Sequence, residues 1–127
     1  MPRVSQGTRT NAKHKAETLP TSFQAGFITA LDGRTELARG LKERFESIAT
    51  DLGGLHELSN IKASLVERFC WLEASLSKIE HDMASADTKT SSELLARWVQ
   101  GCNSLLGIAR TLGIDRKLQA APWLDSL

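Results

Sequence analysis

The stretch that decides the fold is residues 58–83, which read LSNIKASLVERFCWLEASLSKIEHDM. Large apolar side chains recur in it every three or four residues, which is the period of one face of an α-helix. They are Leu58, Ile61, Leu65, Phe69, Leu72, Leu76, Ile79 and Met83. Ser59 is a residue type that commonly caps a helix, so we expect a helix over about 59–85 whose apolar seam packs against a second helix. Val66 and Trp71 lie off this seam and either widen the apolar face or contact something else.

A second segment with helical spacing, residues 32–52, precedes this stretch. Its apolar side chains also repeat every three or four positions. They are Leu37, Leu41, Phe45, Ile48 and Leu52. Asp32 or Thr35 can cap its start. The Gly53-Gly54 pair ends it, because glycine readily adopts the left-handed conformation found at helix C-termini.

A third helical pattern follows a polar loop and runs to about Leu112. Its stripe consists of Leu95, Trp98, Cys102, Leu105, Ala109 and Leu112. Thr90 and Glu93 fit a capping box, and Gly113 stands where a C-terminal glycine cap belongs. Because only a short loop separates this segment from the 59–85 helix, we expect the two to form an antiparallel hairpin.

These patterns predict an all-α fold, with an antiparallel helical hairpin plus one preceding helix. The chain has 127 residues, no Tyr and only three Pro, which favours a single small helical domain over a β-sandwich or barrel. We expect a disordered basic N-terminal arm over residues 1–22, a helical domain over 23–117 and a C-terminal tail over 118–127. Within the domain, residues 23–31 should form a helical turn that docks on the body.

The charge is distributed unevenly along the chain, although the whole chain carries only +1. Residues 1–22 contain Arg3, Arg9, Lys13 and Lys15 against the single acid Glu17, so the arm carries +3 and the remainder −2. A basic arm on a slightly acidic body can capture a polyanion electrostatically. The alternative is that the arm only keeps the protein in solution.

No set of residues resembles a catalytic or metal site. The three histidines are scattered, and no cysteine clusters with them. The acids Glu67, Glu73 and Glu80 are interleaved with Arg68 and Lys78, which is typical of a solvated helix face. We therefore expect no enzymatic activity, no catalytic residues, no metal and no cofactor.

Cys70 and Cys102 lie within helical patterns and indicate buried free thiols in a reducing compartment. No segment approaches the 18 or more apolar residues of a membrane-spanning helix, and the N-terminus lacks the features of a secretory signal. We expect a cytoplasmic protein without a membrane partner, in the host cytoplasm if a phage encodes it.

Tryptophan and glycine positions suggest further contacts. Trp98 lies on the stripe and is expected in the core. Trp71 is a candidate partner contact, and Trp123 with Leu124 forms either a docking element or a cap on the bundle. The third helical segment also contains Gly101 and Gly107. Glycine lowers helix stability, so these positions suggest close approach of a neighbouring helix.

The hairpin region resembles a known family. Residues 65–73 read LVERFCWLE, and residues 104–116 read SLLGIARTLGIDR. A leucine-rich helix that ends in Leu-Gly-Ile and a following Arg is similar to the C-terminal half of some small terminase subunits of tailed phages and prophages. The resemblance covers about residues 59–117. It implies a ring-forming homo-oligomer that recognises double-stranded viral DNA and regulates the large, ATP-hydrolysing terminase subunit.

The chain departs from that family at its N-terminal side. Only residues 23–52 precede the hairpin, too few for the helix-turn-helix domain of many small terminases. DNA binding would therefore use the basic arm, with Arg3, Arg9, Lys13 and Lys15, together with Arg34, Arg39, Lys42 and Arg44. Glu36, Glu43 and Glu46 interrupt the second group, so a solvated face explains it equally well. The alternative function is a protein-interaction or structural module, such as a virion component, adaptor or regulator, that does not bind DNA.

Overall fold

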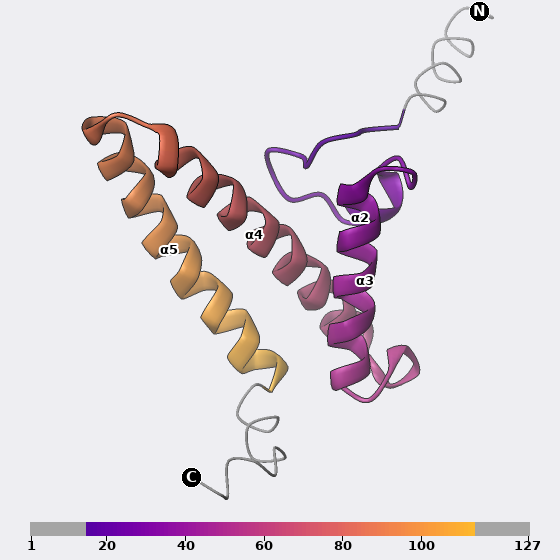
Figure 1. The fold of residues 1–127 in the computed structure, drawn as a ribbon. Helices are drawn as coiled ribbons and strands as arrows, with labels where there is room; N and C mark the ends of the chain where they lie inside the picture. Colours follow the sequence, from indigo (N-terminus) through magenta and orange to yellow (C-terminus); the bar gives the residue numbers. More distant parts are fainter. Residues whose placement is uncertain (1–14, 114–127) are drawn as a thin grey trace, which may run out of the picture.

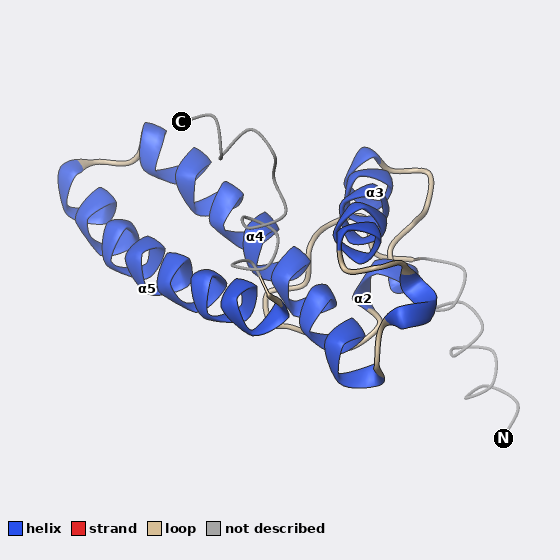
Figure 2. Cartoon of the chain, turned by 90° about the horizontal axis from the view of Figure 1, so that it is seen from below, coloured by secondary structure: helices blue, strands red, loops and turns tan. Residues whose placement is uncertain are grey.

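The computed structural model describes residues 15–113, and within this range the regular structure is helical, without strands. The elements are α2 (Phe27–Ala30), α3 (Glu36–Asp51), a 3-10 turn (Leu55–Glu57), α4 (Asn60–Ser85) and α5 (Thr88–Leu112). The two long helices form an antiparallel hairpin, and α3 contacts α4 (Figure 1). Seen from below, α3 lies beside one end of the hairpin, while the other end extends away from it (Figure 2). The all-α prediction, with one helix preceding a hairpin, is confirmed.

Local capping explains where these helices begin and end. Thr35 Oγ1 accepts a hydrogen bond of 3.2 Å from Ala38 N at the start of α3, and Ser59 caps α4 in the same way through Lys62 N at 3.1 Å. Such caps satisfy backbone donors that the first helical turn leaves free. Gly113 ends α5 in the left-handed conformation, with φ 105°, as predicted.

The predicted capping box at the start of α5 is wrong. The helix begins one turn earlier, and Asp87 is its cap, with Oδ1 accepting from Thr90 N at 2.7 Å. Thr90 therefore lies inside the first turn and donates its N–H to a cap instead of being one. This charge-assisted bond lowers the pKa of the Asp87 carboxyl, and an acid at this position also suits the positive end of the helix dipole.

The core lies where α2, α3 and the ends of the hairpin meet. Its buried members are Phe27, Leu31, Ala38, Leu41, Val66, Cys70 and Leu112. Val66 and Cys70, neither of them on the predicted seam, are 0% and 1% exposed. They are buried because α4 has two neighbours, α3 and α5, and a single seam describes contact with only one of them.

Two members of the predicted seams are exposed instead of buried. Ile61 is 75% exposed. Gly101 of α5 lies against Leu76 of α4, and this contact sets the register of the two antiparallel helices. In this register α5 ends about one turn before it would reach the level of Ile61. Leu95 is 50% exposed, because its stripe repeats at about 3.4 residues, less than the 3.6 of a helix, and therefore rotates around α5.

The glycine predictions have opposite outcomes. A Cβ placed on Gly101 would lie 2.6 Å from Cδ2 of Leu76, so α4 does approach α5 closely at this point. A Cβ on Gly107 would meet no described atom within 4 Å. The close-approach prediction is therefore confirmed for Gly101 and wrong for Gly107.

Residues 15–22 were expected to belong to a disordered arm, but the structure places them against the body. Asp32 N donates to Ala16 O at 2.7 Å, and Trp71 Nε1 donates to Pro20 O at 2.9 Å. These bonds, together with packing of Leu19 on the core, offset the entropy that ordering the segment costs. Residues 1–14 lie outside the described range, as does the tail from residue 114 onward.

Candidate protein-interaction surface

The predicted DNA-binding residues of the helical domain do not gather on one face. At about 100° per residue, Arg39 lies opposite the buried Leu41, whereas Lys42 and Arg44 lie on opposite flanks of α3. Both Arg39 and Lys42 are exposed. The described residues 15–113 carry a net charge of −2. Lys15 is exposed, and Arg3, Arg9 and Lys13 lie outside the described range.

Two of the predicted cations are held by carboxylates. Arg44 makes a two-point contact with Glu73 of α4, with Nε to Oε1 at 2.8 Å and Nη2 to Oε2 at 3.0 Å. The Arg44 guanidinium also lies 5.9 Å from the ring centroid of Phe69. The hydrogen bond to Glu73 raises the pKa of Arg44. Arg44 thus links α3 to α4, which reduces the charge it could offer to a phosphate.

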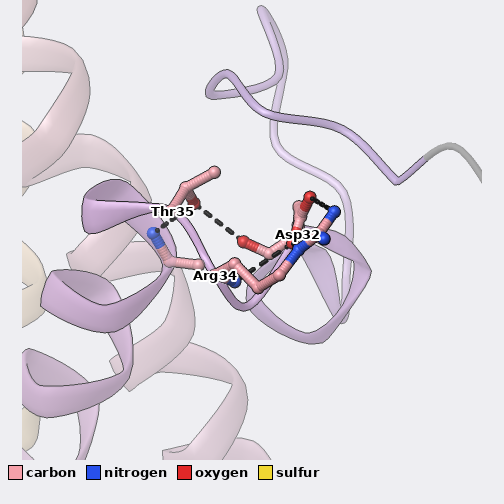
Figure 3. Close-up of polar contacts among 4 residues, drawn as sticks. Asp32, Arg34 and Thr35 are labelled. Carbon is pink, nitrogen blue, oxygen red and sulfur yellow. Dashed lines mark hydrogen bonds and ion pairs between the residues drawn. The ribbon is translucent and has the colours of Figure 1, made fainter.

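Arg34 is paired just before α3 begins (Figure 3). Its Nε and Nη2 donate to Asp32 at 3.1 Å and 2.9 Å, and its backbone N donates to Asp32 Oδ1 at 3.0 Å. The side-chain hydrogen bond from Arg34 is the main cause that lowers the pKa of Asp32 to about 2. Asp32, one of the two predicted caps, therefore organises the turn while Thr35 caps the helix.

The Asp32 turn predicts a loss of stability in acid. Because the pKa of Asp32 in the folded protein lies below its ordinary value of 3.8, its ionised form stabilises the fold above that pH. The contribution is lost as the pH falls toward about 2. We expect Asp32→Asn to lower the melting temperature at pH 5 but to differ little from the native protein near pH 2, as measured by circular dichroism. Arg34→Gln should behave in the same way, and a difference that does not change with pH would contradict the assignment.

Tryptophans 71 and 98 both have partners within the chain. The Trp71 indole bonds Pro20 O and meets the Phe23 ring edge-to-face, with centroids 6.4 Å apart. This accounts for its off-seam position without a second protein. Trp98 is half-buried and donates from Nε1 to Glu80 Oε2 at 2.9 Å. Trp123 and Leu124, the other predicted partner contacts, lie outside the described range.

The acids of α4 do more than form a solvated face. Glu67 Oε1 accepts from Gly26 N at 2.9 Å, and the carboxylates of Glu73 and Glu80 accept from Arg44 and Trp98. Each therefore ties α4 to another element. Across residues 15–113, no group of three or more His, Cys, Asp or Glu is placed to hold a metal ion.

The two thiols have different surroundings. Burial raises the pKa of the Cys70 thiol to about 12, which makes it a poor nucleophile at neutral pH. Cys102 is only partly buried. Both are free thiols.

A stripe of exposed apolar side chains lies on α5. Leu95, Val99 and Leu106 are 50%, 45% and 42% exposed, and their spacing places them on one side of the helix with Cys102 between them. We call these four residues the α5 face. Between Glu93 and Arg110 the only charged residue is Arg97, whereas seven of the sixteen residues of α3 are charged. An exposed apolar stripe without charges is typical of a contact surface.

Sequence reasoning missed the α5 face, because it assigned Leu95 and Cys102 to a core seam. The low charge between Glu93 and Arg110, with Arg97 alone, was the available signal. Beside this face, Leu95 lines a shallow hollow at the hairpin tip, whose other lining residues are Met83, Ala86, Thr88, Ser91 and Ser92.

Comparison with known proteins found no relative of this chain. No protein-family model matches the chain, and no significant match was found among curated proteins or solved structures. None of the helices within residues 15–113 is long and apolar enough to cross a membrane.

Proposed function

We propose that this protein is a non-enzymatic helical assembly module that binds another protein chain through the α5 face. The observation that carries the proposal is the exposure of Leu95, Val99 and Leu106 on the stretch of α5 between Glu93 and Arg110, where Arg97 is the only charged residue. Burying such side chains in a contact removes apolar area from water. The adjacent side of α5, which includes Gly101, already packs on α4, so the hairpin presents this face on a preformed support.

Site-specific photo-cross-linking in cells that make the full-length protein tests this proposal. A photoreactive residue in place of Val99 should form a covalent adduct with a protein chain, detected as a band of higher mass and identified by mass spectrometry. The matched control carries the same residue at Ser77, an exposed position of α4. Absence of any adduct at position 99, or equal adducts at both positions, would refute the proposal.

The DNA-packaging function implied by the terminase resemblance is the second candidate. It is supported by the basic residues Arg3, Arg9 and Lys13 and by the exposed Lys15, Arg39 and Lys42. The acidic balance of residues 15–113 and the pairing of Arg34 and Arg44 argue against a large phosphate-binding surface on the helical domain. DNA affinity would then depend chiefly on the arm.

Removal of residues 1–14 tests the second candidate without disturbing the packed segment that begins at Lys15. If three arm cations contact phosphates, the affinity for duplex DNA should fall with salt with a log–log slope of about −3, and the truncation should abolish that dependence. Fluorescence anisotropy at several salt concentrations measures both. Unchanged binding after truncation, or no binding at low salt, would exclude this role for the arm. A ring-sized mass by light scattering would favour the terminase-like function.

A further inference from the structure

We infer that the partner of the α5 face is a second copy of this chain, docked antiparallel across a two-fold axis. This inference rests on the proposed function and names the partner. The face has a self-complementary spacing: its four residues are separated by 4, 3 and 4 positions, which reads the same in both directions. In an antiparallel two-fold pair, this spacing lets the residues of the face meet one another, with residue i opposite residue j and j opposite i.

The symmetric arrangement pairs the residues in a defined way. With the axis between Gln100 and Gly101, Leu95 of one copy lies opposite Leu106 of the other, and Val99 lies opposite Cys102. Leu106 is 42% exposed. Its counterpart Leu95 borders the hollow at the hairpin tip, so a leucine from the second copy would meet a concave surface there. Close packing of this kind is what distinguishes specific interfaces from casual contacts.

Charge also favours a second copy. When two copies of a chain pair through the same surface, charges of one sign on that surface repel each other across the interface. The α5 face carries none, and Arg97 is the only charged residue between Glu93 and Arg110. In an antiparallel pair, each Arg110 lies level with Ser91 of the other copy and away from its own counterpart. A parallel pair would instead place each Arg110 beside its own counterpart.

The structure also bears on the strength of the association. The α5 helix has 25 residues and is about 37 Å long. A single helix face of this length lies at the small end of specific interfaces, which bury about 800 Å² per partner. We therefore expect a dimer that dissociates on dilution, visible by sedimentation equilibrium of the full chain.

Disulfide trapping tests the pairing and its direction. In a Cys102→Ser background, the double variant Leu95→Cys/Leu106→Cys should form a covalent dimer under mild oxidation, seen on a non-reducing gel. The matched control, Leu95→Cys in the same background, should not, because the two copies of residue 95 lie about 16 Å apart along the antiparallel pair. In a parallel pair the control would cross-link as readily as the double variant, and that result would overturn the inference.

A charge placed on the face tests the association without cross-linking. Val99→Glu should raise the dissociation constant at least about tenfold, because each dimer would bury two unpaired carboxylates. Gln100→Glu adds the same charge beside the face and should have little effect. Circular dichroism checks that both variants are folded.

A monomer at every concentration would overturn the second-copy inference. If position 99 still cross-links to a different protein in cells, the proposed function stands and only the choice of partner is wrong. If position 99 captures no protein chain, both fail.

Discussion

Replacing Phe27 with alanine is expected to lower the free energy of unfolding by about 3–5 kcal/mol, the usual cost of truncating a buried aromatic side chain. Phe27 is 3% exposed and belongs to the cluster that contains Val66 and Cys70 of α4. Its ring also meets that of Phe23 edge-to-face, with centroids 6.1 Å apart. Because α2 has only four residues, it cannot be stable by itself. Loss of Phe27 should therefore detach α2 as well as leave a cavity.

Urea unfolding of the full chain, followed by circular dichroism, measures this effect. The matched control is Ile61→Ala, which truncates an apolar side chain that is 75% exposed and should change stability by less than about 0.5 kcal/mol. Equal effects of the two substitutions would show that α2 does not dock as described. A large effect of Phe27→Ala alone would confirm that the N-terminal segment is part of the core.

The second large effect concerns the close contact between the long helices. Leu76 is 5% exposed, so Leu76→Ala should cost about 2–5 kcal/mol. In the native protein, Gly101→Ala has two opposing effects on the free energy of unfolding. Higher helix propensity adds about 1 kcal/mol, and overpacking against Leu76 removes about 1–3 kcal/mol. Its net effect should be destabilising by up to about 2 kcal/mol.

The combination of the two substitutions reports directly on that contact. Once Leu76 is shortened, the added methyl group has space, so Gly101→Ala should become stabilising by about 1 kcal/mol. A double-mutant cycle should therefore give a coupling of about 1–3 kcal/mol. Gly40→Ala in α3 is the matched control, because its Cβ would meet nothing within 4 Å. It should stabilise both backgrounds equally, and absence of coupling at Gly101 would contradict the described packing.

The helices themselves could be predicted from the sequence because their signals are local. Spacing of apolar residues, the cap at Ser59 and the glycine at 113 each depend on a few neighbouring positions. The start of α5 was misplaced for the same reason: Asp87 and Thr90 are both good caps, and local chemistry does not rank them.

Which face each helix buries could not be predicted, because that depends on contacts between distant residues. A single stripe on α4 predicts one partner, whereas Val66 and Cys70 are buried by a second. The ion pair of Arg44 and Glu73 joins positions 29 residues apart, and the bond from Trp71 to Pro20 joins positions 51 apart. Neither leaves a local pattern. The α5 face was missed because its leucines fit a helical stripe just as core residues do.

The uneven support along α4 has a consequence for motion. The first half of the helix lies against α3 and the core, whereas within residues 15–113 its second half, toward the hairpin tip, has only α5 beside it (Figure 1). Cooperative units with fewer buried apolar contacts open more often than the rest of a protein. Amide hydrogens at the hairpin tip should therefore exchange with solvent faster than those around Val66. Since Leu95 lies at this tip, docking of a partner would slow the exchange there first, so binding and local folding are energetically linked.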